Sequence, residues 1–391
     1  MPDKTRIVFF VDILERHFDG VSNTMHQLAH RTPRDEVEPI FITTFPPTQN
    51  DFPFPVYQCP YVSWILYKDY RIGLPKRMKN LEQILNEFKP QLLHFTSPTL
   101  MGRYAIQYAR AHHLPVTTTY HTHFYSYMEY YFDFFKPLRR RMEKLAISLS
   151  RSFYVAVNAT FVPSEPMKQF LLELGVQEKK IEYFRRGINA QHFDPSFRSQ
   201  EIKKTYGLRD EKIVLFVSRL VKEKELDTII RTYRLFLEKR SDVKFMITGD
   251  GPFKSYMEKR MPEAIFTGKQ TKEQLASLYA SSDVFMFPST TETFGNVVLE
   301  AMASGLPVVA AAAGGPMGIV NRSEAGFVVE PKNEQAFFDK ISEILDNPVK
   351  HQQFSQNAVV YAQSQNWDKL CAQMIAKLRE IAAQGANYPD H

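Results

Sequence analysis

Cysteine is scarce in this chain: Cys59 and Cys371 are the two cysteines among 391 residues, and they lie far apart. No C-x-x-C spacing occurs, which excludes a disulfide framework and a thiolate metal site and fits a reducing compartment. No apolar run approaches the roughly 18 residues that span a bilayer. The opening sequence, MPDKTRIVFFVDILERHFDG, has acids where a signal peptide would have its apolar core. We therefore expect a cytoplasmic protein, either soluble or peripheral on a membrane.

The composition also lacks the features of a disordered chain, because 44% of the residues are hydrophobic and 24% are charged. A length of 391 residues predicts two domains, since one domain usually takes about 100–200. The net charge of +6 comes entirely from residues 1–190, which hold 24 Lys and Arg against 18 Asp and Glu, whereas residues 191–391 hold 25 of each. Such a basic half permits nucleic acid, an anionic membrane or a phosphate-bearing substrate as partner.

Short apolar runs alternate with longer segments of helical periodicity along the whole chain. This pattern is typical of parallel sheets covered by helices on both faces, the doubly wound α/β arrangement. A polar stretch at 188–204 separates two such series, so we predict an amino-terminal domain of residues 1–195, a second of 196–365 and a final helix at 366–391. The strands expected are 6–13, 37–44, 90–96, 114–121, 153–164, 212–220, 243–250, 263–269, 284–290, 306–312 and 326–331.

Residues that directly follow strands are the first candidates for a site, because ligands bind beyond the carboxyl ends of strands in open α/β sheets. In the second half, Arg219 and Lys224 follow the first strand. A guanidinium fork and a mobile ammonium both suit phosphate oxygens, although a solvated basic pair at a helix start is the commoner situation. Gly249 and Gly251, after the next strand, form a turn in which backbone can approach a ligand closely.

The most specific segment is PSTTETFGNVVLEAMASGLPVVA at 288–310. Glu292 lies in a loop after a strand, and the following Phe294, Gly295, Asn296 and Val297 are expected to open a helix. The first N–H groups of that helix have no internal partner, so they suit a diphosphate. Glu300, about two turns further on, is placed to accept hydrogen bonds from sugar hydroxyls. Two acids beside an anion site favour a ligand that carries both hydroxyls and phosphates.

These motifs together resemble retaining glycosyltransferases of the GT-B fold, family 4. The resemblance rests on the E-x7-E pair, the SRLVKEK segment, ITGDGP, EAMASGLPVVA and AAGGPMGIV, and it extends over nearly the whole chain. It implies two Rossmann-like domains facing each other across a cleft. It also implies that Arg219 and Lys224 bind a diphosphate, that Glu300 binds the ribose, and that Glu292 holds the donor sugar together with Thr293, Phe294, Gly295, Asn296 and Val297.

In the amino-terminal half, the resemblance points to three further places. Gly20 and Val21 match the end of the family's G-G-V loop near the diphosphate and the acceptor, while Asp19 replaces its first glycine. His121 matches a strand-end histidine near the reaction centre. Arg186 lies in a segment similar to the one that connects the two domains beside the cleft. The final helix is expected to return to the first domain, and the reaction requires the two domains to close on each other.

The implied activity is transfer of a hexosyl group from a UDP- or GDP-linked sugar to a hydroxyl with retention of configuration. No D-x-D motif follows a strand, so neither a metal nor a cofactor is expected. In style the chain is closest to enzymes that glycosylate diacylglycerol or phosphatidylinositol lipids. A soluble acceptor and a sugar-nucleotide epimerase stay open as alternatives. A nucleic-acid-binding protein is a remote alternative, because no recognised module accompanies the basic residues. The sugar, the base and the oligomeric state are not determined by the sequence.

Residues 120–151 carry the signs of a membrane-facing surface. Nine of the sixteen residues at 120–135 are aromatic, and six Lys and Arg residues follow by residue 151 against one acid, Glu143. Aromatic rings beside basic side chains favour the interface of an anionic bilayer. The competing interpretation is that the aromatics are core and the basic residues a solvated helix face. We predict peripheral association with the inner face of the cytoplasmic membrane, where a lipid acceptor would lie.

Overall fold

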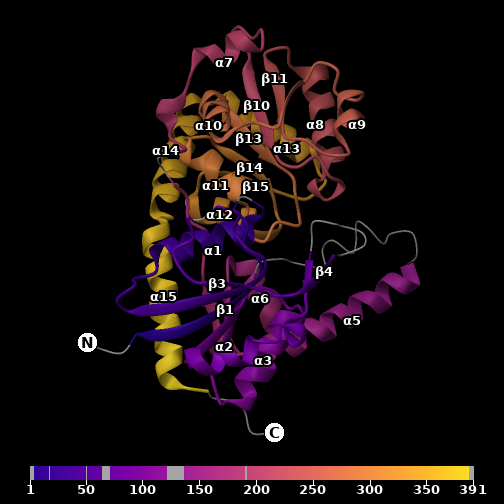
Figure 1. The fold of residues 1–391 in the computed structure, drawn as a ribbon. Helices are drawn as coiled ribbons and strands as arrows, with labels where there is room; N and C mark the ends of the chain where they lie inside the picture. The colour runs from indigo at the N-terminus through magenta and orange to yellow at the C-terminus, as the bar shows by residue number, and fades with distance from the viewer. Residues whose placement is uncertain are drawn as a thin grey trace. The chain divides into compact units, whose positions relative to one another are not determined.

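A computed structural model describes residues 4–16, 18–49, 51–63, 71–120, 136–189 and 192–386. These residues form two compact units, each built on its own parallel sheet (Figure 1). Unit 1 extends to Arg186, and Gly187–Asn366 form unit 2. From Trp367 onward the chain belongs to unit 1 again. The doubly wound α/β class predicted for both halves is confirmed.

The sheet of unit 1 has the strand order β3-β2-β1-β6-β7-β8-β9, with every neighbouring pair parallel. The order reverses direction between β1 and β6, so the carboxyl ends of these two strands flank the switch point. A separate antiparallel hairpin is formed by β4 and β5. The strands are β1 (Thr5–Ile13), β2 (Val37–Phe45), β3 (Val56–Gln58), β4 (Tyr61–Ser63), β5 (Arg71–Gly73), β6 (Leu92–Phe95), β7 (Val116–Thr119), β8 (Ala159–Val162) and β9 (Ile181–Tyr183).

The helices of unit 1 cover its sheet with amphipathic faces. Residues such as Met25 and Leu28 of the first helix are buried against the strands, as a period of 3.6 residues requires. The helices are α1 (Gly20–Arg31), α2 (Leu81–Phe88), α3 (Leu100–Ala111), α5 (Lys136–Val155), α6 (Glu165–Glu173) and α15 (Trp367–Gln384), with short 3-10 turns at Pro75–Arg77 and Glu178–Lys180.

The last helix, α15, belongs to unit 1 although it follows unit 2 in the sequence. Its buried side chains Cys371, Met374, Ile375 and Leu378 join the same apolar cluster as residues of β1 and α1. The ion pair between Arg31 Nε and Asp368 Oδ1, at 2.6 Å, ties α1 to the start of α15.

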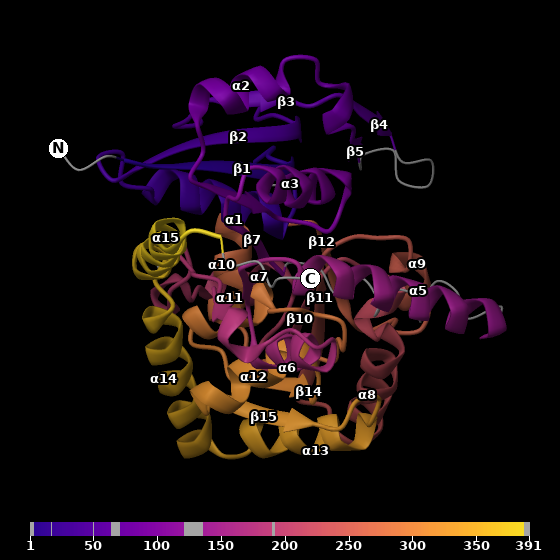
Figure 2. The ribbon, with the colours of Figure 1, turned by 90° about the horizontal axis from the view of Figure 1, so that it is seen from below.

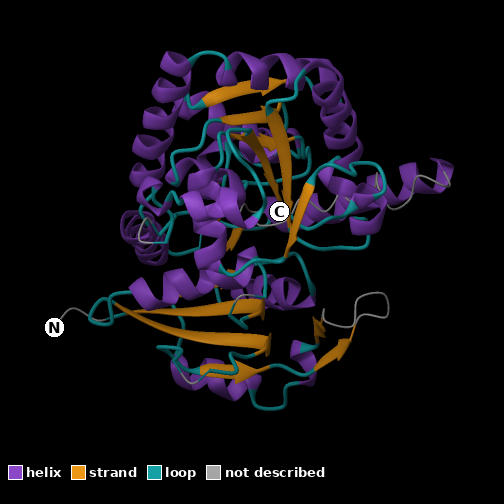
Figure 3. Ribbon diagram, turned by 90° about the horizontal axis from the view of Figure 1, so that it is seen from above, coloured by secondary structure: helices purple, strands orange, loops and turns teal. Residues whose placement is uncertain are grey.

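The sheet of unit 2 has the order β12-β11-β10-β13-β14-β15, again all parallel (Figure 3). Its switch point lies between β10 and β13. The strands are β10 (Lys212–Val217), β11 (Val243–Thr248), β12 (Ile265–Gly268), β13 (Val284–Phe287), β14 (Val308–Ala311) and β15 (Gly326–Val329). The helices are α7 (Gln200–Thr205), α8 (Leu226–Lys239), α9 (Lys254–Glu258), α10 (Lys272–Ser281), α11 (Asn296–Ala303), α12 (Gly314–Ser323), α13 (Glu334–Leu345) and α14 (Pro348–Ser364), with 3-10 turns at Pro195–Phe197 and Lys222–Lys224.

The structure differs from the sequence-based expectation in two places. The strand predicted at 153–164 is in fact the end of α5, a turn, and β8, because the apolar residues from 153 on complete the helix before the strand begins. The polar stretch chosen as the boundary, near residue 195, also lies later than the division at Arg186. The Ile188 amide donates to the Gln365 carbonyl at 2.9 Å, and this backbone contact places the segment after Arg186 in unit 2.

None of the described helices is long and apolar enough to span a bilayer.

Cys59 and Cys371 are both free and buried. Burial raises the pKa of both thiols, to about 11 for Cys59 and to about 12 for Cys371, so neither is a reactive thiolate at neutral pH.

Candidate active site

The switch point of unit 2 brings together the two loops that the sequence singled out. Lys224 ends the 3-10 turn after β10, and Glu292 follows β13, the neighbouring strand of the sheet. The Lys224 ammonium forms an ion pair with the Glu292 carboxylate. Lys224 is almost fully buried, with 6% of its side chain exposed, while Glu292 keeps 27% exposed. The pair therefore presents a carboxylate to solvent and holds a cation directly behind it.

The two loops are fastened to each other next to this pair. The Ser289 and Thr291 hydroxyls both donate to the Glu223 carbonyl, each at 3.4 Å. Since Glu223 directly precedes Lys224, these bonds set the position of the ammonium relative to the loop that carries Glu292. The geometry is thus held by buried polar contacts that do not depend on a ligand.

Arg219 lies in the loop directly after β10 and is exposed. No side chain in the described part of the chain pairs with its guanidinium, so it is available to an anion from solvent. Its loop packs closely on the next one: a Cβ on Gly249 would come within 1.9 Å of the Ser218 carbonyl oxygen, and one on Gly251 within 2.5 Å of the Leu220 oxygen. These glycines are therefore required by the contact between two loops. Ligand binding by Gly249 and Gly251 stays a prediction.

Helix α11 begins at Asn296, with Gly295 as its N-cap in the left-handed region at φ +100°. The Asn296 and Val297 N–H groups have no carbonyl partner within the helix and carry the positive end of its dipole, whereas the Val298 amide donates to the Gly295 carbonyl at 3.0 Å. Phe294 is buried in the apolar core of unit 2, which anchors the loop from the inside. The start of α11 thus lies just after Glu292 in the chain and presents donors of the kind that bind phosphate.

A second glycine pair, Gly314 and Gly315, opens α12 against this same loop. The Gly315 amide donates to the Glu292 carbonyl at 2.8 Å. A Cβ on Gly314 would lie 2.3 Å from that carbonyl oxygen, and one on Gly315 would lie 2.3 Å from Phe294 Cα. The sequence analysis used AAGGP only as part of the resemblance and assigned no role to these glycines. Their role is to let the start of α12 approach the backbone of the loop that carries Glu292.

Glu300 lies in the second turn of α11 and accepts a hydrogen bond from the Tyr279 hydroxyl of α10 at 3.2 Å. Burial raises the pKa of Glu300 to about 7, while the Tyr279 hydroxyl and Lys272 oppose the shift. Burial and the adjacent carboxylate also raise the pKa of Tyr279 well above its ordinary value. Tyr279 is thus a donor that orients Glu300, and no sequence motif pointed to it.

The raised pKa predicts that ligand binding depends on the charge of Glu300. Unfolded, this carboxyl titrates near 4.5, so between that pH and about 7 the folded state holds more protons and the free energy of unfolding falls as pH rises. If the ionised form accepts bonds from ribose hydroxyls, the Kd for a nucleoside diphosphate should rise about tenfold between about pH 8 and about pH 6. Titration calorimetry across this range measures it. Glu300→Gln should flatten the profile, and an equally steep profile in that variant would contradict the assignment.

In unit 1, the loop after β1 and the segment after β9 are brought together. Asp19 is the N-cap of α1: its Oδ1 accepts from the Ser22 amide at 2.7 Å, and the helix begins with Gly20 and Val21. Burial raises the pKa of Asp19, and the nearby Arg186 guanidinium opposes that shift. Burial lowers the pKa of Arg186 to about 10, against the influence of Asp19. Asp19, which replaces the first glycine of the family's G-G-V loop, therefore caps α1 and interacts with the buried Arg186 guanidinium.

Asp12 is a further candidate that the sequence analysis missed. It lies near the end of β1, at the switch point of unit 1, and its Oδ1 accepts from the Thr99 hydroxyl at 3.0 Å. Burial raises the pKa of Asp12 to about 6, and hydrogen bonds from Thr99 and Ser97 oppose the shift. An acid within the apolar strand FFVDI was the available signal, since a partly buried carboxylate at a strand end is unusual without a function.

Two sequence-based predictions lie elsewhere. His121 and the aromatic segment 120–135, apart from the buried Tyr120, fall outside the described residues.

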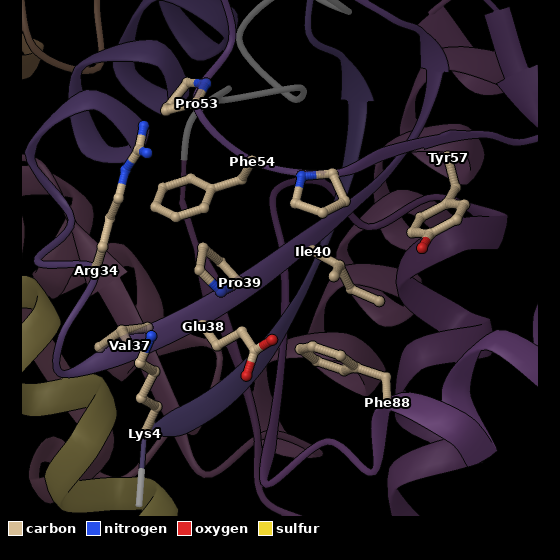
Figure 4. A pocket seen from close by; sticks show the side chains of 11 residues that line it. Lys4, Arg34, Val37, Glu38, Pro39, Ile40, Pro53, Phe54, Tyr57 and Phe88 are labelled. Atoms are coloured by element: carbon tan, nitrogen blue, oxygen red, sulfur yellow. The ribbon is translucent and has the colours of Figure 1, made fainter. Parts of the chain in front are cut away.

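A hollow of about 360 Å³ lies on unit 1, lined by Pro39, Phe54, Phe88 and neighbouring side chains (Figure 4). It adjoins the first residues of β2, whereas the candidate residues follow strands, so it contains none of them.

Comparison with known families matches both halves of the chain. Residues 18–192 match the model described as Glycosyltransferase Family 4. Residues 198–360 match the model described as Glycosyl transferases group 1. The second match contains Arg219, Lys224, Glu292 and Glu300, so the site residues predicted in unit 2 lie within it.

Three relatives are 28–33% identical to this chain over the aligned residues. A GDP-mannose-dependent alpha-mannosyltransferase of Corynebacterium glutamicum is 28% identical over 86% of this chain and 78% of its own length. The sulfoquinovosyl transferase SQD2 of Arabidopsis thaliana is 33% identical over 74% of this chain, which spans only 55% of that protein. Alpha-monoglucosyldiacylglycerol synthase of Streptococcus pneumoniae is 28% identical over 78% of this chain and 70% of its length.

Solved structures agree on the fold. Sucrose-phosphate synthase from Thermosynechococcus elongatus has a TM-score of 0.74 at 20% identity, covering 97% of this chain and 100% of that one. Anabaena HepE, solved in complex with UDP, has a TM-score of 0.72 at 17% identity, covering 96% and 100%. The chain has two Rossmann-like sheets, both family models match it, and solved glycosyltransferases share its fold. The chain therefore belongs to glycosyltransferase family 4 and has the GT-B fold.

Proposed function

We propose that the protein transfers a hexosyl group from a nucleoside diphosphate sugar to the hydroxyl of a membrane lipid, with retention of anomeric configuration. The observation that carries the donor half is the arrangement at the switch point of unit 2. There the Lys224–Glu292 pair lies in loops fastened to each other, and α11 begins a few residues after Glu292. One end of this sheet carries a cation, hydrogen-bond donors and carboxylates. Together these groups suit a ligand that contains both a diphosphate and a sugar.

Each group has a distinct task in donor binding. Arg219, Lys224 and the first N–H groups of α11 bind the diphosphate oxygens. Glu300, oriented by Tyr279, accepts hydrogen bonds from the ribose hydroxyls. Glu292 accepts hydrogen bonds from the donor sugar. Two of the relatives and neighbours fit such a donor by name, since one depends on GDP-mannose and another was solved with UDP.

In the reaction, the bond between the anomeric carbon and the diphosphate oxygen breaks, and the acceptor oxygen bonds to the same face of that carbon. The departing phosphate oxygen takes the proton of the acceptor hydroxyl, so no separate base is needed. Negative charge grows on the diphosphate as the bond breaks, and the cations and helix N–H groups are already in place to stabilise it. No divalent metal is assigned a role. His121 lies outside the described residues, and its role near the reaction centre stays a prediction.

A lipid acceptor is supported by the relatives and by charge. One relative is named for synthesis of a glucosyldiacylglycerol. In unit 1, Lys144 and Arg151 are exposed on α5, and both belong to the basic segment predicted to face a membrane. We therefore propose peripheral association with an anionic bilayer through residues 120–151, with the acceptor hydroxyl presented from the headgroup layer.

The donor assignment is tested by thermal shift with a panel of nucleoside diphosphates and their sugars. The cognate ligand at a hundred times its Kd should stabilise the wild type by about 2.7 kcal/mol. Arg219→Ala and Glu300→Ala should each weaken binding by about 1.5–3 kcal/mol, the value of a charge-assisted hydrogen bond. Arg234→Ala, which removes an exposed arginine of α8, is the matched control.

Three outcomes would each contradict a part of this proposal: the site, the transfer reaction or the lipid acceptor. Wild-type-like shifts in both Arg219→Ala and Glu300→Ala would contradict the site. If the donor binds as predicted, product analysis with and without lipid vesicles identifies the acceptor. Release of an altered sugar without any acceptor would indicate an epimerase, and transfer only to a water-soluble hydroxyl would contradict the lipid assignment.

A further inference from the structure

Tyr279, the donor to Glu300, is itself held by two aromatic rings. The ring of Phe193 lies 5.9 Å from it, centroid to centroid, at an interplanar angle of 73°. The ring of Phe285, on β13, lies 5.7 Å away at 65°. Both contacts are edge to face, an arrangement that aromatic rings favour and that fixes their relative orientation. Because Tyr279 is also fully buried, its hydroxyl is held in place beside the Glu300 carboxylate.

Phe193 comes from a segment near the beginning of unit 2. We call residues 193–199, which precede α7, the entry segment. Phe193 is 7% exposed and belongs to the same apolar core cluster as Tyr279. The other end of the segment is tied to α10 as well: the Ser199 amide donates to Ser281 Oγ at 2.9 Å, and the Ser281 hydroxyl donates to the Ser199 carbonyl at 3.3 Å. The entry segment therefore holds the end of α10 at two points.

Helix α10 in turn lies beside α11, which carries Glu300 (Figures 1 and 2). The Tyr279 hydroxyl donates to Glu300 Oε2 at 3.2 Å. Glu300 Oε1 accepts no hydrogen bond within the described part of the chain, so this oxygen is available to a ligand. The direction of the carboxylate thus depends on α10, and the position of α10 depends on the entry segment.

We propose that Tyr279 and Phe193 are positioning residues for the ribose contact. Phe193 fixes the ring of Tyr279, and the Tyr279 hydroxyl directs the Glu300 carboxylate toward the ribose hydroxyls. This inference rests on the proposed function, which it deepens by naming what sets the preference of the site for a ribonucleotide over a deoxyribonucleotide. Glu300 contacts the ligand, while Tyr279 and Phe193 act through Glu300.

Ordering the carboxylate before the ligand arrives has a physical benefit. A glutamate side chain rotates about several bonds, and fixing it on binding costs conformational entropy. The hydrogen bond from Tyr279 orders Glu300 in advance, so a ribose hydroxyl meets an acceptor already in place. The benefit applies to the ribose hydroxyls and not to the phosphates, which we assign to Arg219, Lys224 and the start of α11.

Calorimetric titration of the full chain with UDP, GDP and their 2′-deoxy forms tests the proposal. The wild type should bind the ribonucleotide of its preferred base about tenfold or more tightly than the deoxy form, because the extra hydroxyl donates to a charged acceptor. Tyr279→Phe keeps the ring but removes the hydroxyl, so this preference should fall to about threefold or less. Tyr256→Phe is the matched control, since the Tyr256 hydroxyl donates to a different acid, Asp227, at 2.7 Å.

Phe193→Leu tests the entry segment in the same titration. Loss of the ring contact should lower the ribonucleotide preference about threefold and also lower the Tm, because a buried ring is shortened. Phe337→Leu is the control for stability alone: Phe337 is fully buried in the same core cluster but lies on α13. This control should lower the Tm and leave the preference unchanged.

Donor binding keeps this test separate from the proposed function. All variants should still bind the 2′-deoxy diphosphate like the wild type, because none of them alters a phosphate contact. An unchanged preference in Tyr279→Phe would overturn the proposal, as would equal preferences in Phe193→Leu and Phe337→Leu. A wild type that binds both forms equally would overturn it together with the ribose role of Glu300. A wild type that binds no nucleoside diphosphate would contradict the transferase assignment itself.

Discussion

Replacing Lys224 with methionine should lower kcat/KM for glycosyl transfer by about a hundredfold or more. The substitution keeps an unbranched chain of similar length but leaves the Glu292 carboxylate without its cation. Removing one member of a buried pair costs about 3–5 kcal/mol of folding stability, and the low end applies here because Glu292 is partly exposed. The same change removes a charge-assisted contact from the diphosphate site, worth about 1.5–3 kcal/mol. A loss of about 3 kcal/mol in transition-state binding lowers kcat/KM about a hundredfold.

Lys222→Met is the matched control, since Lys222 is exposed two residues earlier in the same 3-10 turn. Steady-state kinetics of the two variants, with Tm as the check on folding, measures the effect. The double variant Lys224→Met, Glu292→Gln should lose less than the sum of the single losses, because the unpaired carboxylate is removed. Equal kinetics of Lys222→Met and Lys224→Met would contradict a role for the pair.

Gly314→Ala should destabilise unit 2 and weaken donor binding together. The new Cβ would lie 2.3 Å from the Glu292 carbonyl oxygen, so either α12 or the loop that carries Glu292 must move. Overpacking of this kind costs about 1–3 kcal/mol, and strain at φ +57° adds to it. We expect the Tm to fall by about 5–10 °C and the Kd for the nucleoside diphosphate to rise about tenfold.

Gly207→Ala is the control that measures the cost of backbone strain without a steric clash. Gly207 has a similar backbone conformation at φ +66°, but nothing lies within 4 Å of an added Cβ. This control should lose about 1–2 kcal/mol of stability and bind donor like the wild type. Calorimetric unfolding and nucleotide titration of both variants give the comparison. Unchanged donor affinity in Gly314→Ala would show that the loop position does not matter for binding.

Much of this site was predictable because strand ends in a parallel sheet meet at one edge. Lys224 and Glu292 are 68 residues apart in sequence, yet each lies in the loop after a strand, and β10 and β13 are neighbours. The helix opening at Asn296 was readable from the glycine before it and from the apolar residues after it. Local sequence and sheet topology together therefore predict which residues share the switch point.

The remaining features depend on packing between elements distant in the chain, which a local pattern does not contain. Tyr279 orients Glu300 from another helix, and a buried tyrosine looks like any other core residue in sequence. Asp19 was recognised only as a departure from a glycine, although its capping of α1 and its charge toward Arg186 explain it. The apolar run from 153 looked like a strand because α5 ends with the same residue types that strands favour.

The central claim is that a nucleoside diphosphate binds at the switch point of unit 2 with its phosphates on Lys224. The most direct measurement is calorimetric titration of the wild type and Lys224→Met with the mono- and diphosphates of uridine and guanosine. The wild type should bind the cognate diphosphate far more tightly than the monophosphate, and Lys224→Met should lose most of that preference while still binding the monophosphate. An unchanged preference for the diphosphate in Lys224→Met would contradict the claim.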